Sequence, residues 1–203
     1  TQSYVFDGSQ YTDGESNYVA ALDVENGAKG VIENLSISVK ANRPENKESD
    51  DKQLIGIRNH NGIVEFGGQS LDIGITTDFI GSGNSQCAAI DLLKEENSPA
   101  GFMTTISADK VNLKVASTNA EGKAVYGIGL GADMTVSASE MEVNLSTATE
   151  RASDENKNTY SEAIGIDVHS ASTLNAEKLE SLKITGTSIG KTKTCLLYTS
   201  PSP

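Results

Sequence analysis

A sequence unit of about 25 residues that recurs five times constrains this chain more than any other feature. Each copy starts with a small residue followed by Leu or Ile, and these pairs recur at intervals of 35, 33, 38 and 38 residues. The pairs are Ala21–Leu22, Gly56–Ile57, Ala89–Ile90, Gly127–Ile128 and Gly165–Ile166. A fixed unit at such spacing is typical of a solenoid, because each copy buries its apolar face only by stacking on its neighbours.

Within each copy the apolar residues recur at every second position, which is the pattern of a β-strand. In the first copy Leu22 and Val24 begin this alternation, and Leu35, Ile37 and Val39 complete it. Three short strands separated by bends predict an all-β fold, a parallel β-helix (β-solenoid) of about five coils, with equivalent residues about 4.8 Å apart. The copies lie near residues 18–39, 54–75, 87–115, 124–146 and 163–186, and their closing strands are expected to begin at Leu35, Leu71, Val111, Met141 and Leu179.

Two irregularities interrupt the repeat. In the fifth copy Leu179 and Leu182 are three apart, a helical spacing, but Leu182 and Ile184 return to period two, so the extra residue is interpreted as a β-bulge. The third copy carries an insertion at 94–101. Polar segments separate the copies and predict variable loops that emerge at one corner of the stack, at residues 40–53, 76–86, 116–123 and 147–161.

The two termini predict a fragment that is open at both ends. The chain starts at Thr1 without Met, and residues 1–17 are interpreted as the end of a preceding coil plus a loop, which leaves 18–194 as the β-helix repeat domain. Residues 195–203, CLLYTSPSP, resemble the translation of a transposon-end sequencing adapter. They are therefore expected to be a non-native tail after a natural chain that ends near Thr194, and they are left out of the fold prediction.

The composition disfavours several classes of protein. A net charge of −12 argues against nucleic-acid binding, because a phosphate backbone requires clustered Lys and Arg. Aromatic residues make up 5% of the chain and Trp is absent, so the core is expected to consist of small and aliphatic side chains. Outside the tail, Cys87 is the only cysteine, which rules out an internal disulfide and predicts a buried thiol. No apolar run in the sequence approaches the roughly 20 residues that span a bilayer.

A recurring pattern links the chain to a known family. The pattern is a small residue with Ile-x-Val, then Thr-Val/Leu-x-Ala, then Leu-x-Val-x-Val, and over residues 18–186 it resembles the passenger region of bacterial autotransporter adhesins. The resemblance implies export across a Gram-negative outer membrane and display at the extracellular cell surface. It implies a host surface, a glycan or a neighbouring bacterial cell as partner, and membrane contact only through a C-terminal β-barrel that this fragment lacks. We therefore expect an adhesive β-helix stalk with loop-based binding, no catalysis and no cofactor.

One polar column follows the anchor pairs and offers the alternative of an enzyme. We call Asp23, Arg58, Asp91, Gly129 and Asp167 the aspartate column, because stacking would place them on successive coils. Polysaccharide lyases of this fold use carboxylates to hold calcium and a basic residue to abstract a proton, so Asp23, Arg58 and Asp91 are the catalytic candidates of a carbohydrate-active alternative. The favoured interpretation is a ladder at an exposed strand position, in which Arg58 neutralises two aspartates that would otherwise repel each other.

The remaining polar residues favour structural roles. Lys110, Glu140 and Lys178 alternate in charge and are expected to form a second ladder that opposes register slippage. His60 and His169 have no Cys or carboxylate at zinc-ligand spacing, so no metal site is predicted. The acidic loop residues are interpreted as solvated charge: Glu48, Asp50, Asp51, Asp154 and Glu155. The sequence contains no nucleophile elbow, P-loop or dinucleotide motif.

Overall fold

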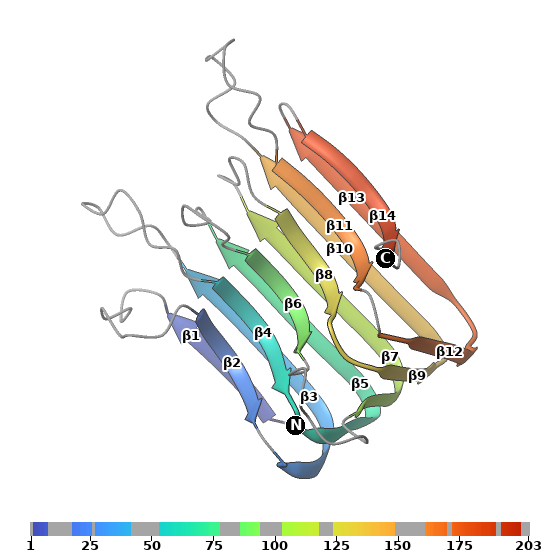
Figure 1. The fold of residues 1–203 in the computed structure, drawn as a ribbon. Helices are drawn as coiled ribbons and strands as arrows, with labels where there is room; N and C mark the ends of the chain where they lie inside the picture. The colour runs from blue at the N-terminus through green and yellow to red at the C-terminus, as the bar shows by residue number, and fades with distance from the viewer. Residues whose placement is uncertain are drawn as a thin grey trace.

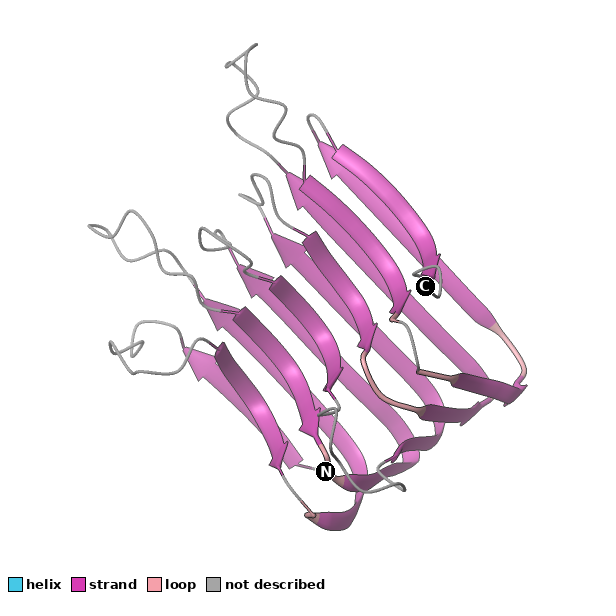
Figure 2. Ribbon diagram, viewed as in Figure 1, coloured by secondary structure: helices cyan, strands magenta, loops and turns pink. Residues whose placement is uncertain are grey.

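The computed structural model describes an all-β parallel solenoid, which confirms the predicted fold class. It describes residues 2–7, 18–25, 27–41, 53–77, 86–93, 103–117, 124–148, 161–169, 172–189 and 192–199. Figures 1 and 2 show their strands stacked side by side, with no helix among them. The strands are β1 (Gln2–Asp7), β2 (Tyr18–Glu25), β3 (Lys29–Ala41), β4 (Gln53–His60), β5 (Ile63–Thr77), β6 (Gln86–Leu93), β7 (Met103–Ser117), β8 (Ala124–Leu130), β9 (Met134–Ala138), β10 (Glu140–Ala148), β11 (Ser161–Val168), β12 (Leu174–Leu179), β13 (Leu182–Ile189) and β14 (Thr192–Thr199).

Two parallel sheets face each other across the core (Figure 1). One sheet has the order β2-β4-β6-β8-β11-β14, so successive copies contribute successive strands. The other has the order β1-β3-β5-β7-β10-β13, and β9 joins it by pairing with both β7 and β12. Within the described ranges, no helix has the length and apolar character needed to cross a membrane.

The predicted stacking of the anchor pairs is confirmed residue by residue. Leu22 pairs with Ile57, Ile57 with Ile90, Ile90 with Ile128, and Ile128 with Ile166. The three central residues of this column are fully buried, with relative exposures of 0%. Each buried Ile contributes roughly 1.5 to 3 kcal/mol through removal from water. The repeat therefore folds by placing the same apolar position of each copy on top of the previous one.

The closing strands follow the predicted register in four copies and depart from it in the fifth. Leu35, Leu71, Val111 and Met141 form one column as expected. Met141 then pairs with Leu182, so the prediction that the fifth closing strand starts at Leu179 is wrong. The reason is a break at residues 180–181, which belong to no strand, so β12 ends at Leu179 and β13 begins at Leu182.

The predicted β-bulge in the fifth copy also lies elsewhere. The register between β9 and β12 shifts between Asn175 and Lys178, where two residues of β12 face one residue of β9. Leu179 consequently pairs with Ala138, and Lys178 pairs with Ser137. The extra residue is thus accommodated inside β12, between Asn175 and Lys178, and not at Leu182.

Three strands per coil are present in copies four and five, whereas the first three copies merge the second and third strands. β3, β5 and β7 are continuous strands of 13, 15 and 15 residues that turn the corner without a break. In β3 and β5 the corner is made by Asn34 at φ 54° and Gly68 at φ 90°. The backbone N–H of Gln69 donates to Asn34 Oδ1 at 2.7 Å, which fixes the bend. Glycine is required at residue 68 because a Cβ there would lie 2.6 Å from Asn34 Oδ1.

Among the described residues, the core between the sheets is mainly aliphatic and includes the aromatic ring of Phe66, at 1% exposure. Cys87 is 1% exposed, which confirms the predicted buried thiol, and burial raises the pKa of this thiol to about 12. Burial decreases toward β13, where Leu182 is 46% exposed. The stack is therefore most tightly packed in its middle copies.

The predicted loops between copies fall mostly on residues outside the described ranges, as does the insertion at 94–101. The strands that flank these loops are described. Ala41 pairs with Thr77 and Thr77 with Ser117, while Gln86 pairs with Ala124 at the start of the following strands. The strand ends that carry the loops are therefore stacked at one corner of the solenoid (Figure 1).

The terminal segments extend both sheets. β1 pairs with β3, with Gln2 opposite Leu35. β14 pairs with β11, with Leu197 opposite Ile166, so the backbone register of the anchor column continues into residues 195–199. The origin of those residues in an adapter stays a prediction.

Candidate functional site

The aspartate column exists as predicted, on the sheet formed by β2, β4, β6, β8 and β11. Asp23 pairs with Arg58, Arg58 with Asp91, Asp91 with Gly129, and Gly129 with Asp167. Asp23 is exposed as expected, but the expectation is wrong for Arg58, Asp91 and Asp167, which are only 8%, 7% and 6% exposed. Charges with so little contact with water require partners, so the column is the strongest candidate site among the described residues.

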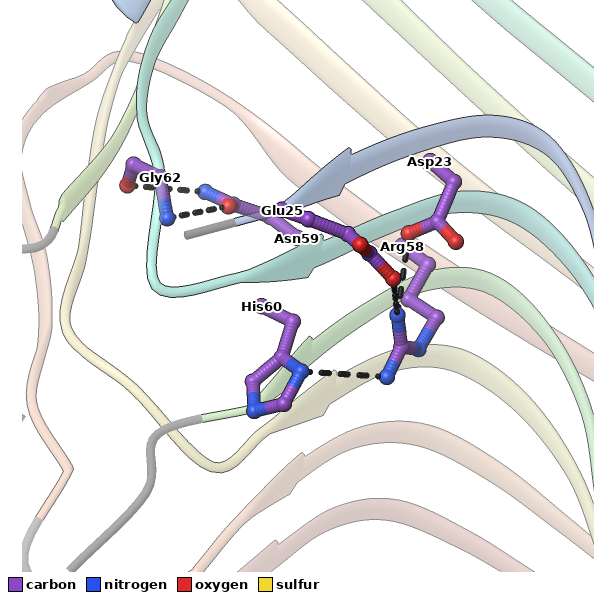
Figure 3. A network of polar contacts seen from close by, with 6 residues as sticks. All are labelled: Asp23, Glu25, Arg58, Asn59, His60 and Gly62. Carbon is purple, nitrogen blue, oxygen red and sulfur yellow. Dashed lines mark hydrogen bonds and ion pairs between the residues drawn. The ribbon is translucent and has the colours of Figure 1, made fainter. Parts of the chain in front are cut away.

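Arg58 lies at the centre of an ion-pair network (Figure 3). Its Nη1 donates to Asp23 Oδ1 at 3.0 Å and lies 3.6 Å from Glu25 Oε1. Its Nη2 lies 3.2 Å from His60 Nδ1. Because a guanidinium only donates, Nδ1 of His60 accepts in this contact. The first and second copies are thereby linked through charged groups on β2 and β4.

Asp91 is the other strand neighbour of Arg58 and is held in an unfavourable environment for a carboxylate. Burial raises its pKa from 3.8 to about 6, although the charges of Arg58 and His169 pull the pKa back down. The desolvation of the carboxylate therefore outweighs the electrostatic attraction of its neighbours. Near neutral pH, Asp91 is ionised at a cost to the folded state.

Asp167 repeats this situation two strands further along the column. Burial raises its pKa, and the charge of His169 opposes the rise. Its Oδ2 lies 3.3 Å from His169 Nε2, while its Oδ1 is buried without a hydrogen-bond partner among the described residues. A buried carboxylate oxygen without a donor is costly, so His169 satisfies Asp167 only in part within the described residues.

Gly129 separates these two carboxylates. Asp91 Oδ1 lies only 3.0 Å from the position that a Cβ at residue 129 would occupy, so the Asp91 side chain leans over the glycine. Gly129 has no positive φ that would require glycine on backbone grounds. A side chain at residue 129 is therefore disfavoured by crowding from the Asp91 carboxylate, and not by the backbone conformation.

Asn59 is a buried polar residue that the sequence analysis missed. It is 4% exposed and caps the turn between β4 and β5. Its Oδ1 accepts from the Gly62 N–H at 2.9 Å, and its Nδ2 donates to the Gly62 carbonyl at 3.2 Å and to Thr104 Oγ1 at 2.8 Å. These bonds satisfy the amide fully enough to hold a polar group inside an apolar column.

The second predicted ladder is confirmed only in part. Lys110 and Glu140 pair across β7 and β10, with 3.9 Å between Nζ and Oε2. Lys178 does not join them, because the register shift inside β12 places it opposite Ser137. Lys183 instead bonds Glu142 at 2.6 Å, and this contact lowers the pKa of Glu142 and raises that of Lys183.

Metal ligation has little support in the described part of the chain. No group of three or more His, Cys, Asp or Glu side chains there is placed to hold a metal ion. His60 contacts Arg58 and His169 contacts Asp167, and the two lie on β4 and directly after β11. The acidic loop residues named above lie outside the described residues.

Comparison of the chain with protein-family models, with curated proteins and with solved structures found no match. The role of the aspartate column is therefore inferred from its geometry alone.

Proposed function

We propose that this chain is a structural and adhesive passenger segment of a bacterial protein displayed at the cell surface, similar to an autotransporter. In this proposal the solenoid is a stalk and the loops at its corner bind a host surface, a glycan or a neighbouring bacterial cell. The observation that carries the proposal is that outer polar side chains are used to join one copy to the next.

Each of these contacts links strands of neighbouring copies and lies on an outer face of the stack. They comprise charged pairs and hydrogen bonds from hydroxyl and amide groups. The pairs are Asp23–Arg58, Glu65–Ser107, Asp72–Asn112, Lys110–Glu140 and Glu142–Lys183. Apart from the pair that includes the buried Arg58, these contacts are exposed and contribute only about 0 to 1 kcal/mol each. Together the contacts penalise a slip in register that would expose the apolar face. Such a distribution suits an extended, stiff support.

The position of the loops supports a binding role at one corner. Strands β3, β5, β7 and β10 end there, and β4, β6, β8 and β11 begin there. Variable polar segments that emerge from a rigid scaffold are the usual place for recognition, because their sequence can change without disturbing the stack. The net charge of −12 disfavours nucleic acid as the partner.

Replacement of the loops tests this proposal. In one variant, residues 42–52, 78–85, 118–123 and 149–160 are exchanged for Gly-Ser segments of equal length. Fluorescent beads coated with either protein are applied to a glycan array and to bacterial cells. We expect the parent chain to bind and the loop variant to lose binding while its circular dichroism spectrum stays that of a β-fold. Equal binding by the loop variant would contradict loop-based recognition.

One observation favours the alternative of a carbohydrate-active enzyme. Asp91 has a pKa of about 6 and adjoins the buried Arg58, and perturbed carboxylates beside a cation are common at catalytic sites. Against it, Arg58 is a permanently charged guanidinium bound to Asp23, which makes it a poor proton acceptor. The discriminating assay is release of unsaturated sugar from pectin or a similar polymer with calcium present. Turnover that Arg58→Ala abolishes would establish the enzyme and overturn the stalk proposal.

A further inference from the structure

The turn between β4 and β5 contains an asparagine–glycine pair, Asn61–Gly62, inside the fold. Asn61 is 3% exposed and has a φ of 65°, a left-handed conformation that asparagine tolerates better than most residues. Such pairs are chemically labile, because glycine has no side chain to shield its backbone nitrogen from the preceding side-chain amide. The turn therefore places a reactive pair of residues at a buried position.

The reaction of this pair is deamidation, and it needs only the chain and water. The backbone nitrogen of Gly62 attacks Cγ of Asn61, a C–N bond forms, and the side-chain nitrogen leaves as ammonia with the proton of the Gly62 N–H. Water then opens the succinimide ring at one of its two carbonyls and leaves aspartate or isoaspartate at position 61. The attack therefore requires the Gly62 N–H to be free to give up its proton.

Asn59 holds the attacking nitrogen in another contact (Figure 3). The Gly62 N–H donates to Asn59 Oδ1 at 2.9 Å, and Asn59 Nδ2 donates to the Gly62 carbonyl at 3.2 Å. Asn59 Nδ2 also donates to Thr104 Oγ1 at 2.8 Å, which anchors the Asn59 side chain to β7. Because Asn59 is only 4% exposed, water cannot readily replace these bonds, and opening the turn is costly.

Backbone contacts hold the same turn against the first copy. The Gly27 N–H donates to the Asn61 carbonyl at 3.0 Å, and the Ile63 N–H donates to the Ala28 carbonyl at 2.9 Å. Deamidation would place a carboxylate at a position with almost no contact with water, and isoaspartate would also lengthen the backbone by one methylene group. The modified turn would therefore no longer fit the contacts that join the first two copies.

We propose that Asn61–Gly62 is a deamidation site that Asn59 keeps closed, so that the reaction proceeds only when this turn opens. Asn59 is a positioning residue, because it holds the Gly62 N–H and takes no part in bond formation. The site does not depend on the function proposed above, since the reaction needs no partner. Deamidation at Asn61 thus records how often the turn between β4 and β5 opens.

Incubation of the full chain at pH 7.5, followed by peptide mass spectrometry, measures deamidation at Asn61. We expect the folded chain to react at least about tenfold more slowly than the same chain in concentrated urea, the size of effect that a buried hydrogen bond gives. Hydrogen exchange of the Gly62 amide provides a second measurement. Because the attack requires this hydrogen bond to open, folding should slow deamidation by at least the factor by which it slows the exchange.

Matched variants separate the role of Asn59 from general packing. Asn59→Ala removes the acceptor of the Gly62 N–H and should accelerate deamidation at Asn61 by about tenfold or more. Asn59→Asp keeps an oxygen acceptor at the same place and should react at a rate nearer to that of the parent. Thr104→Val removes only the contact between Asn59 and β7, so it should accelerate the reaction far less than Asn59→Ala. If Asn59→Ala fails to fold, the comparison of deamidation with hydrogen exchange in the parent still decides the question.

Three results would overturn the proposal. The first is deamidation at Asn61 that is as fast in the folded chain as in urea. The second is a slowing of deamidation smaller than the slowing of Gly62 hydrogen exchange, because the attack would then occur with the hydrogen bond intact. The third is no acceleration by Asn59→Ala, or an equal acceleration by Thr104→Val, which would assign the protection to packing.

Discussion

Replacement of Asp91 by asparagine should stabilise the protein at neutral pH, which is an unusual outcome for the loss of a charge beside an arginine. The folded pKa of Asp91 is about 6, against 3.8 for an ordinary aspartate. Each unit corresponds to 1.36 kcal/mol, so ionised Asp91 costs the folded state about 3 kcal/mol at pH 7.5. Asparagine resembles the protonated acid and avoids most of this cost.

The sign of the pH dependence follows from the same difference. A folded pKa above the unfolded one means that the folded state binds more protons as the pH falls through about 6. Stability should therefore rise by about 1 kcal/mol between pH 7.5 and pH 5, and by about 3 kcal/mol once the pH lies below the ordinary aspartate range. Asp167, whose pKa is also raised by burial, acts in the same direction.

Urea unfolding followed by circular dichroism at pH 7.5 and pH 5 measures both effects. We expect Asp91→Asn to have the higher free energy of unfolding at pH 7.5, with a smaller gain on acidification than the parent. Asp72→Asn is the control, because Asp72 is half-buried and accepts hydrogen bonds from Ser70 and Asn112. It should be neutral or slightly destabilising. A loss of more than about 1 kcal/mol in Asp91→Asn at pH 7.5 would show that the ionised Asp91 carboxylate stabilises the folded state.

Three further substitutions test the packing and the network. Ile128→Asp places a charge at a fully buried position and should lower the free energy of unfolding by about 3 to 5 kcal/mol. The control Ser38→Asp, at an exposed position, should lower it by less than about 0.5 kcal/mol. Similar values for the two variants would show that Ile128 lies at the surface. Asn59→Ala leaves the partners of its hydrogen bonds unsatisfied and should cost about 2 to 4 kcal/mol in the same assay, so a neutral result would contradict the capping role. Arg58→Met should destabilise more at pH 7.5 than at pH 5, where Asp91 is largely protonated. A cost independent of pH would contradict the electrostatic coupling between Arg58 and Asp91.

The fold was predictable because two independent periodicities agree. The period of two within a copy indicates strands, and the spacing between copies indicates stacking, so the column from Leu22 to Ile166 could be aligned without a structure. In the fifth copy this alignment placed the closing strand three residues too early, at Leu179 and not at Leu182. Its register depends on whether the extra residue is accommodated inside β12 or near Leu182. The sequence around Leu179 and Leu182 is compatible with both positions. Only the pairing of Met141 with Leu182 decides between them.

The alignment of the aspartate column could be predicted from the sequence, but the burial of its side chains could not. Equal spacing placed Asp91 and Asp167 in line with Arg58, whereas their burial depends on how neighbouring side chains cover an outer face, which periodicity does not report. Glu25 and His60 were findable, because they lie two residues beyond members of the column on the same face. Asn59 was findable too, since its column otherwise holds the apolar residues Val24, Leu92, Leu130 and Val168.

The proposed stalk depends on the stacking of the copies in this register. Zero-length carbodiimide coupling of the unmodified chain, followed by peptide mass spectrometry, tests it directly. The structure predicts a covalent link between Lys183 and Glu142, whose charged atoms are 2.6 Å apart, and a weaker yield between Lys110 and Glu140. A dominant link between Lys178 and Glu140 would contradict this register, because the structure places Lys178 opposite Ser137.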